Sequence, residues 1–178
     1  AALAGTQVNL PPMLSARIPA LMVQQYFGVQ METDQLIADA TVMFHYLFSD
    51  LGADPKISAA AMAAKDRVNA AIDASAATAG PETLLGRAVA SGKAGNPAFD
   101  ADGIRANIIG IVIGAIPTLS KASCLAVEEL LRRPAALAKL RSLAAASDEA
   151  AVADMAGDRC REAGLGDVAL RGLDALGE

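Results

Sequence analysis

The chain has 178 residues, a formal net charge of -5, 53% hydrophobic residues and only 3% aromatic residues. The acidic balance and the scattered Lys and Arg argue against a nucleic-acid-binding surface, and the aliphatic, alanine-rich composition is typical of close-packed helices. Two cysteines form no disulfide framework, and the first residues lack the pattern of a signal peptide. We therefore expect a soluble, cytoplasmic protein in a reducing compartment, and a piece of a longer chain, since no initiator Met is present.

Hydrophobic spacing predicts four helices in the first half of the chain, over residues 13–27, 34–50, 58–77 and 82–90. Gly28 is expected to end the first helix, and Thr33 and Ser58 to cap the next two. Residues 91–97 read as a loop. The residues expected to face inward are Leu14, Ile18, Leu21, Met22 and Tyr26 in the first helix, Leu36, Ile37, Ala40, Met43, Phe44 and Leu47 in the second, Val68 and Ile72 in the third, and Leu84, Leu85 and Val89 in the fourth.

The stretch from Asp100 to Pro134 predicts one long helix over residues 100–133. Residues 106–120 carry no charge and are apolar on all sides, so we expect a central helix that is buried on every side. Asp100 suits its N-cap, and two acids near its end are spaced to pair with two arginines, Glu128 with Arg132 and Glu129 with Arg133. The uncharged part is shorter than the roughly 20 residues that span a membrane, so we expect no membrane partner.

The middle of this helix is rich in small residues around a proline, in the order Gly110, Gly114, Ala115, Pro117, Thr118 and Ser120. Pro117 cannot donate to the carbonyl four residues back, and glycines let another group approach the backbone. A helix of this kind is a suitable wall for a ligand pocket. The alternative is a proline kink that only relieves packing, with the Thr118 hydroxyl bonded to a carbonyl of its own helix.

Further helices are predicted over residues 134–146 and 147–164, with a weaker one over 166–176, and no stretch shows the alternation of a strand. The predicted fold class is all-α, an orthogonal multi-helix bundle around one long buried helix. We expect a single domain or fragment over residues 1–178, with a divergent tail over 147–178.

Residues 104–134 resemble the long helix that crosses the cytochrome P450 fold. The likeness is carried by Arg105 and Asn107, the Gly114-Ala115 pair, Thr118, Ser120-Lys121 and the ending EELLRRP. Residues 18–29, IPALMVQQYFGV, and 81–90, PETLLGRAVA, resemble two upstream segments of that family, in the family's order. The resemblance covers about residues 16–146 and implies a partial P450-like fold.

The resemblance also implies roles for residues of the long helix. Gly114 and Ala115 would lie over the haem, and Thr118 would be the catalytic distal hydroxyl. A small apolar substrate would contact a pocket formed by Gly110, Ile111, Ile113 and Pro117. Pro117 stands where the family commonly has an acid, which favours a peroxygenase or isomerase-like member over ordinary oxygen activation.

The iron ligand of that family is a cysteine in a Phe-x-x-Gly-x-x-x-Cys-x-Gly loop. Cys160 has Ala at the Phe position and Ala at the first Gly position, and Cys124 lies inside the long helix. No downstream Glu-x-x-Arg helix is visible either. We therefore expect the distal, substrate-side portion of a haem-thiolate oxidoreductase, a monooxygenase or peroxygenase, that by itself binds no haem, holds no metal and is inactive.

Two other readings stay open. A non-catalytic binding or structural module would self-associate through the apolar helix at 100–134. A helical ligand-binding regulator would need a basic recognition segment, and none is visible. His45 is a lone histidine, Cys124 reads as a small buried hydrophobe, and Cys160 between two arginines is weak evidence for chemistry. The acids at 148–158 read as a solvated face.

Overall fold

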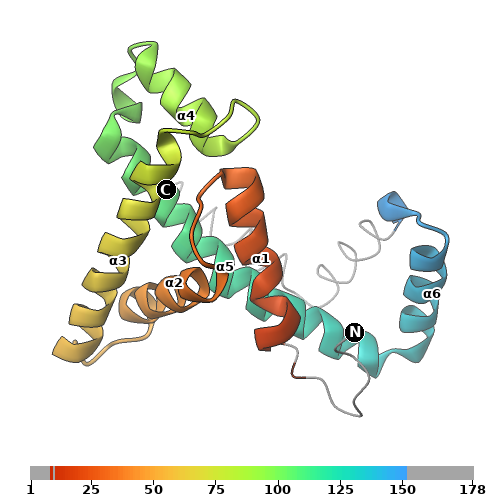
Figure 1. Ribbon diagram of the computed structural model, residues 1–178. Helices are drawn as coiled ribbons and strands as arrows, with labels where there is room; N and C mark the ends of the chain where they lie inside the picture. Colours follow the sequence, from red (N-terminus) through yellow and green to blue (C-terminus); the bar gives the residue numbers. More distant parts are fainter. Residues whose placement is uncertain (1–8, 10, 152–178) are drawn as a thin grey trace, which may run out of the picture. The chain divides into compact units, whose positions relative to one another are not determined.

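A computed structural model describes residue 9 and residues 11–151, and over these residues the protein is all-α, as predicted, with no strand (Figure 1). The chain divides into two compact units, Ala1–Lys121 and Ala122–Glu178. The long helix α5, Ala101–Arg132, contributes residues to both units. The expectation of a single domain stays a prediction.

The predicted first helix is instead three short segments: the π-helical turn η1 (Pro11–Ser15), α1 (Arg17–Met22) and the π-helical turn η2 (Val23–Phe27). Gly28 ends them with a φ of 84°, which confirms its predicted role. The predicted inner face is wrong: Leu14, Ile18, Leu21 and Tyr26 are exposed, while the buried residues are Ser15, Pro19, Ala20, Val23 and Phe27. Ser15 and Ala20 on the buried face are smaller than Leu14, Ile18 and Leu21, and they allow a closer approach to neighbouring helices.

Helices α2 (Thr33–Phe48) and α3 (Pro55–Ala76) make the most extensive helix contact of the first unit. Their N-caps are Glu32 and Asp54, whose carboxylates accept from the amides of Gln35 and Lys56. The predicted caps Thr33 and Ser58 are therefore wrong, because these carboxylates begin the helices earlier. The core between the two helices is formed by Leu36, Ala40, Met43, Ala61, Ala64, Val68 and Ile72.

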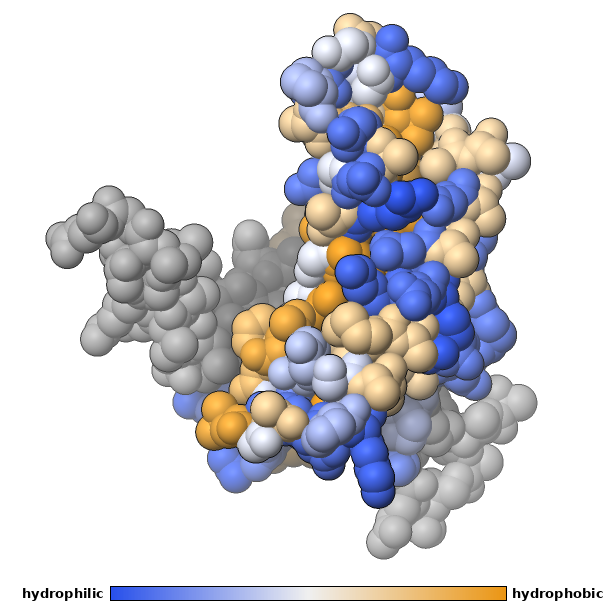
Figure 2. All heavy atoms as spheres, turned by 90° about the vertical axis from the view of Figure 1, so that its left-hand side faces the viewer, coloured by the Kyte–Doolittle hydropathy of each residue, from blue (hydrophilic) through white to orange (hydrophobic). Residues whose placement is uncertain are grey.

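Not every predicted inward residue of α2 is buried, because Leu47 is 55% exposed. Leu47 belongs to a group of exposed hydrophobic side chains around the α2–α3 connection, together with Phe48, Leu51 and Met62. The face seen from the α3 side carries a band of hydrophobic side chains (Figure 2).

Helix α4 (Leu84–Lys93) and the 3-10 turn η3 (Pro97–Phe99) lead into α5. Thr83 caps α4, since its hydroxyl oxygen accepts from the Gly86 amide at 3.0 Å. The same side chain leaves no room for a Cβ at Gly28, which would lie 2.8 Å from the Thr83 Cβ. One threonine thus begins α4 and fixes the path of the chain after η2.

Helix α5 runs through Pro117 as one continuous helix, close to the predicted range. Its buried residues form a single stripe at a spacing of four, Ile104, Ile108, Val112 and Ile116. Ile111 and Leu119 are 38% and 41% exposed. The expectation that α5 is buried on every side is therefore wrong for the described residues. The other helices of the first unit pack on one side of α5 only, and a uniformly apolar sequence does not encode which side that is.

By length and composition, α5 is long and apolar enough to cross a membrane, a test that the core helix of a soluble protein also passes. The uncharged part is short, but the helix as a whole is not. Its first half is tied to the bundle by the buried stripe and by Arg105, whose guanidinium pairs with Asp73 of α3 at 2.8 Å. The absence of a membrane partner stays a prediction.

In the second unit, α5 ends and α6 (Pro134–Ala145) follows. The predicted ion pairs are confirmed, Glu128 with Arg132 and Glu129 with Arg133, each at 2.6 Å. Cys124 is partly buried. The predicted helix over 166–176, Cys160, and most of the 147–178 tail lie outside the described residues.

Candidate functional site: the open face of α5

One face of α5 is exposed. Asn107, Gly110, Ile111, Gly114 and Thr118 follow one another at spacings of three and four residues, so they share this face, and all five are exposed. We call these five residues the open face. It lies away from the stripe that packs into the core, and four of its members, all except Asn107, are residues for which the sequence predicted a role beside the haem or the substrate.

Space is free above both glycines of the open face. A Cβ built on Gly110 or Gly114 would meet no atom within 4 Å. Gly103, in the first turn of the same helix, is different, because a Cβ there would lie 2.3 Å from the Ala98 carbonyl oxygen. The described contacts therefore explain the glycine at 103 and give no reason for the other two.

The Thr118 hydroxyl is on the open face, but it is already engaged. It donates to the Gly114 carbonyl of its own helix and lies 3.4 Å from the Ala115 carbonyl oxygen. This is the back-bonded arrangement considered as the alternative from the sequence. Pro117 precedes it, and the Ile113 carbonyl therefore receives no hydrogen bond from position 117.

An apolar hollow of about 220 Å³ adjoins the open face between α4, η3 and α5. Two of the open-face residues, Asn107 and Ile111, form part of its wall. The Asn107 side-chain amide donates to the Gly103 carbonyl of its own helix at 2.8 Å. The remaining lining residues are Leu84, Ala88, Phe99, Ile104 and Ile108.

The structure brings together only some of the predicted site residues. Gly110, Ile111, Gly114 and Thr118 share the open face, whereas Ile113 lines a separate hollow of about 120 Å³ formed with α2 and α3. Ala115 and Pro117 are partly buried and line neither hollow. Leu84 was predicted only to face inward from its helix, and Phe99 had no predicted role. Nothing in the sequence placed them beside Ile111, because a hydrophobic pattern does not encode contacts between helices.

The described residues fit a haem only in part. The open face leaves room for a flat group at both glycines, but it carries no thiol or imidazole. His45 is exposed on α2, Cys124 lies in the second unit, and no cluster of three metal-ligating side chains exists among the described residues. These residues therefore do not form a haem-thiolate site by themselves.

Comparison with known proteins finds no match to this chain among family models, curated proteins or solved structures.

Proposed function

We propose that this chain is the distal, substrate-side portion of a cytochrome P450-like haem-thiolate oxidoreductase, a monooxygenase or peroxygenase, with the helix arrangement of the corresponding part of that fold. The observation that carries the proposal is the free space above Gly110 and Gly114 directly beside an apolar hollow. The ordered motifs of residues 104–134 support it.

Each part of the open face has a role in this proposal. Gly114, followed by Ala115, lets a flat cofactor approach the helix backbone. The hollow beside Ile111 takes a small apolar substrate, because its lining is aliphatic and aromatic with Asn107 as the one polar side chain. Thr118 supplies a hydroxyl, which must leave the Gly114 carbonyl to act on a ligand. When bound, haem supplies the oxidation chemistry of the family.

The decisive test is the encoding reading frame on both sides of this chain. We expect it to contain a Phe-x-x-Gly-x-x-x-Cys-x-Gly loop after residue 178. A reading frame that reaches its stop codon without encoding such a loop would contradict the proposal.

A spectroscopic test uses the chain as it stands. After incubation with ferric haem, reduction and addition of carbon monoxide, we expect no thiolate-type spectrum, because neither cysteine has the ligand-loop pattern. A thiolate spectrum would show that Cys124 or Cys160 ligates iron and that our reading of the cysteines is wrong.

A second candidate function is a non-catalytic helical module that self-associates through α5. It is favoured by exposed hydrophobic side chains at two places on the first unit, with Ile111 at the first of them 38% exposed. One is the open face. The other is the outer side of the first segments, where Leu14, Ile18 and Leu21 are 49%, 55% and 42% exposed.

Sedimentation velocity over a range of concentrations tests self-association. We expect the chain to form dimers or larger oligomers, and Ile111→Glu to shift it to monomer by placing a charge on the open face. Ala59→Glu is the matched control, since Ala59 is exposed near the start of α3. A monomer at high concentration, or equal behaviour of the two variants, would exclude this candidate.

A further inference from the structure

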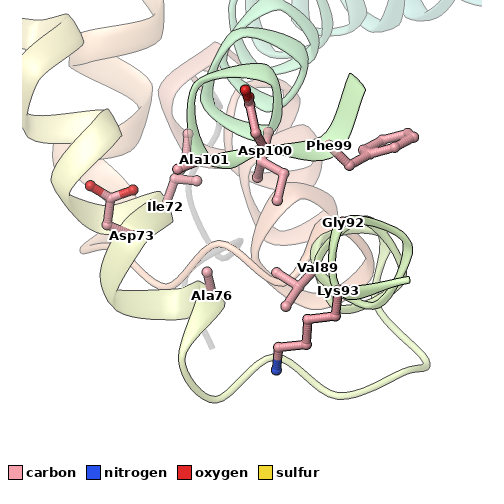
Figure 3. Close-up of a pocket in the computed structure, with 10 residues that line it drawn as sticks. Ile72, Asp73, Ala76, Val89, Gly92, Lys93, Phe99, Asp100 and Ala101 are labelled. Carbon is pink, nitrogen blue, oxygen red and sulfur yellow. The ribbon is translucent and has the colours of Figure 1, made fainter. Parts of the chain in front are cut away.

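The first unit contains a second hollow, separate from the open face, of about 380 Å³. It lies where the end of α3, the end of α4 and the start of α5 meet (Figure 3). We propose that this hollow binds a small aliphatic carboxylate, with its hydrocarbon chain against the apolar floor and its carboxylate beside Lys93. The proposal stands apart from the P450-like function and does not depend on it.

The floor of the hollow is apolar and firmly placed. Ile72 is fully buried and Ile104 is 8% exposed, so both are held by the core. Ala76, Val89 and Phe99 are partly buried around them. The volume lies within the usual range of about 300–1,000 Å³ for small-ligand sites. Because aliphatic side chains make most of this floor, it favours a hydrocarbon chain.

Lys93 is placed to hold the polar end of such a ligand. It follows Val89 by four residues, so both side chains project from the same side of α4 (Figure 3). Lys93 is exposed and has no ion-pair partner within 4 Å among the described residues.

The two acids that line the hollow are already hydrogen-bonded within the protein. Asp73 accepts two hydrogen bonds from the Arg105 guanidinium, both at 2.8 Å, and these bonds hold the pKa of its carboxyl below the usual value. Asp100 accepts from the Gly103 amide at 2.7 Å, where the N-terminus of α5 favours a negative charge. Lys93 is the one cationic side chain that lines the hollow.

The direct test is a titration with sodium octanoate, 1-octanol and octylamine. Binding is measured by calorimetry or from the NMR chemical shifts of the residues that line the hollow. We expect octanoate to bind most tightly and octylamine least. Lys93→Gln should weaken octanoate binding about three- to fivefold, the size expected for one solvent-exposed ion pair, and leave octanol unchanged. Lys65→Gln is the matched control, because Lys65 lines the separate hollow near Ile113. This substitution should leave the affinities for octanoate and for octanol unchanged.

A second variant tests the apolar floor. Ala76→Phe fills the hollow and should abolish binding of octanoate and octanol alike, with circular dichroism used to verify the helix content. Octylamine binding as tightly as octanoate, an unchanged octanoate affinity in Lys93→Gln, or retained binding in folded Ala76→Phe would each overturn the proposal. Failure of Ala76→Phe to fold leaves the Lys93→Gln comparison decisive.

Discussion

Asp39 is the one acidic side chain that is almost fully buried among the described residues, at 1% exposure. Its carboxylate accepts from the Arg67 guanidinium at 2.6 and 3.0 Å and from the Gln35 side-chain amide at 2.9 Å. A buried carboxylate is tolerated because such donors replace water. Removal of Arg67 therefore leaves a charge in the core with only one neutral donor.

We predict that Arg67→Met lowers the melting temperature by on the order of 5 °C or more. Arg17→Met is the matched control, because Arg17 pairs with Asp34, which is 70% exposed and readily hydrated. Its melting temperature should change by about 1–2 °C or less. Thermal denaturation followed by circular dichroism measures both, and equal losses would show that burial of Asp39 does not set the cost.

Gly28 and Gly95 both have positive φ, at 84° and 90°, but only Gly28 has a close neighbour. We predict that Gly95→Ala costs about 1–2 kcal/mol through backbone strain alone. Gly28→Ala should cost about 1–3 kcal/mol more, because its Cβ would lie 2.8 Å from the Thr83 Cβ. Urea denaturation of the two variants separates strain from crowding, and equal costs would show that Thr83 moves away freely.

At the scale of the helix, α5 offers a matched comparison of glycines. Gly103→Ala should destabilise by about 1–3 kcal/mol, since its Cβ would crowd the Ala98 carbonyl at 2.3 Å. Gly110→Ala should stabilise the dilute monomer by about 0.5–1 kcal/mol, because alanine favours a helix and the space is free. If Gly110→Ala instead lowers the free energy of unfolding at low protein concentration, the open face is covered within the monomer.

The existence of most helices could be predicted from the sequence, and the range of α5 to within a residue at each end. Periodicity and turn residues carry this information because they act locally. The N-caps were misplaced by one residue at Thr33 and by four at Ser58, since several polar residues precede each helix and more than one of them is a suitable cap.

Helix faces were harder to predict than helices. Leu14, Ile18 and Leu21 have the spacing of a buried stripe, yet Ala20 and Val23 on the other side are the buried residues. When both sides of a helix are apolar, hydrophobicity cannot choose between them. The grouping of Gly110, Gly114 and Thr118 followed from helical spacing, whereas the apolar hollow depends on Leu84 and Phe99 from other elements.

At the scale of the whole molecule, acid should destabilise the fold. Hydrogen bonds from Arg105 lower the pKa of Asp73, and hydrogen bonds from the Gln35 and Asp34 amides lower that of Glu32. A carboxylate with a lowered pKa stabilises the fold fully above its unfolded pKa of about 4, and this contribution is lost as the pH falls through the folded value.

We predict that Asp73→Asn lowers the stability at pH 7 modestly, because the pair is partly exposed, and flattens the loss of stability below about pH 4. Asp66→Asn, at an exposed position of the same helix, should keep the wild-type slope. Urea midpoints measured from pH 7 to pH 3 test this, and an unchanged slope in Asp73→Asn would show that the Arg105 pair carries no pH dependence.

The turn of α5 around Gly114 and Pro117 is held by fewer interactions than the turns near Ile104 and Ile108. Pro117 brings no amide proton, the Gly114 carbonyl is shared with the Thr118 hydroxyl, and two glycines leave the backbone bare to water. Deuterium should therefore replace the amide protons of this turn sooner than those near Ile104 and Ile108. Any molecule that settles on this face would slow that replacement, so isotope exchange can report an occupant before its identity is known.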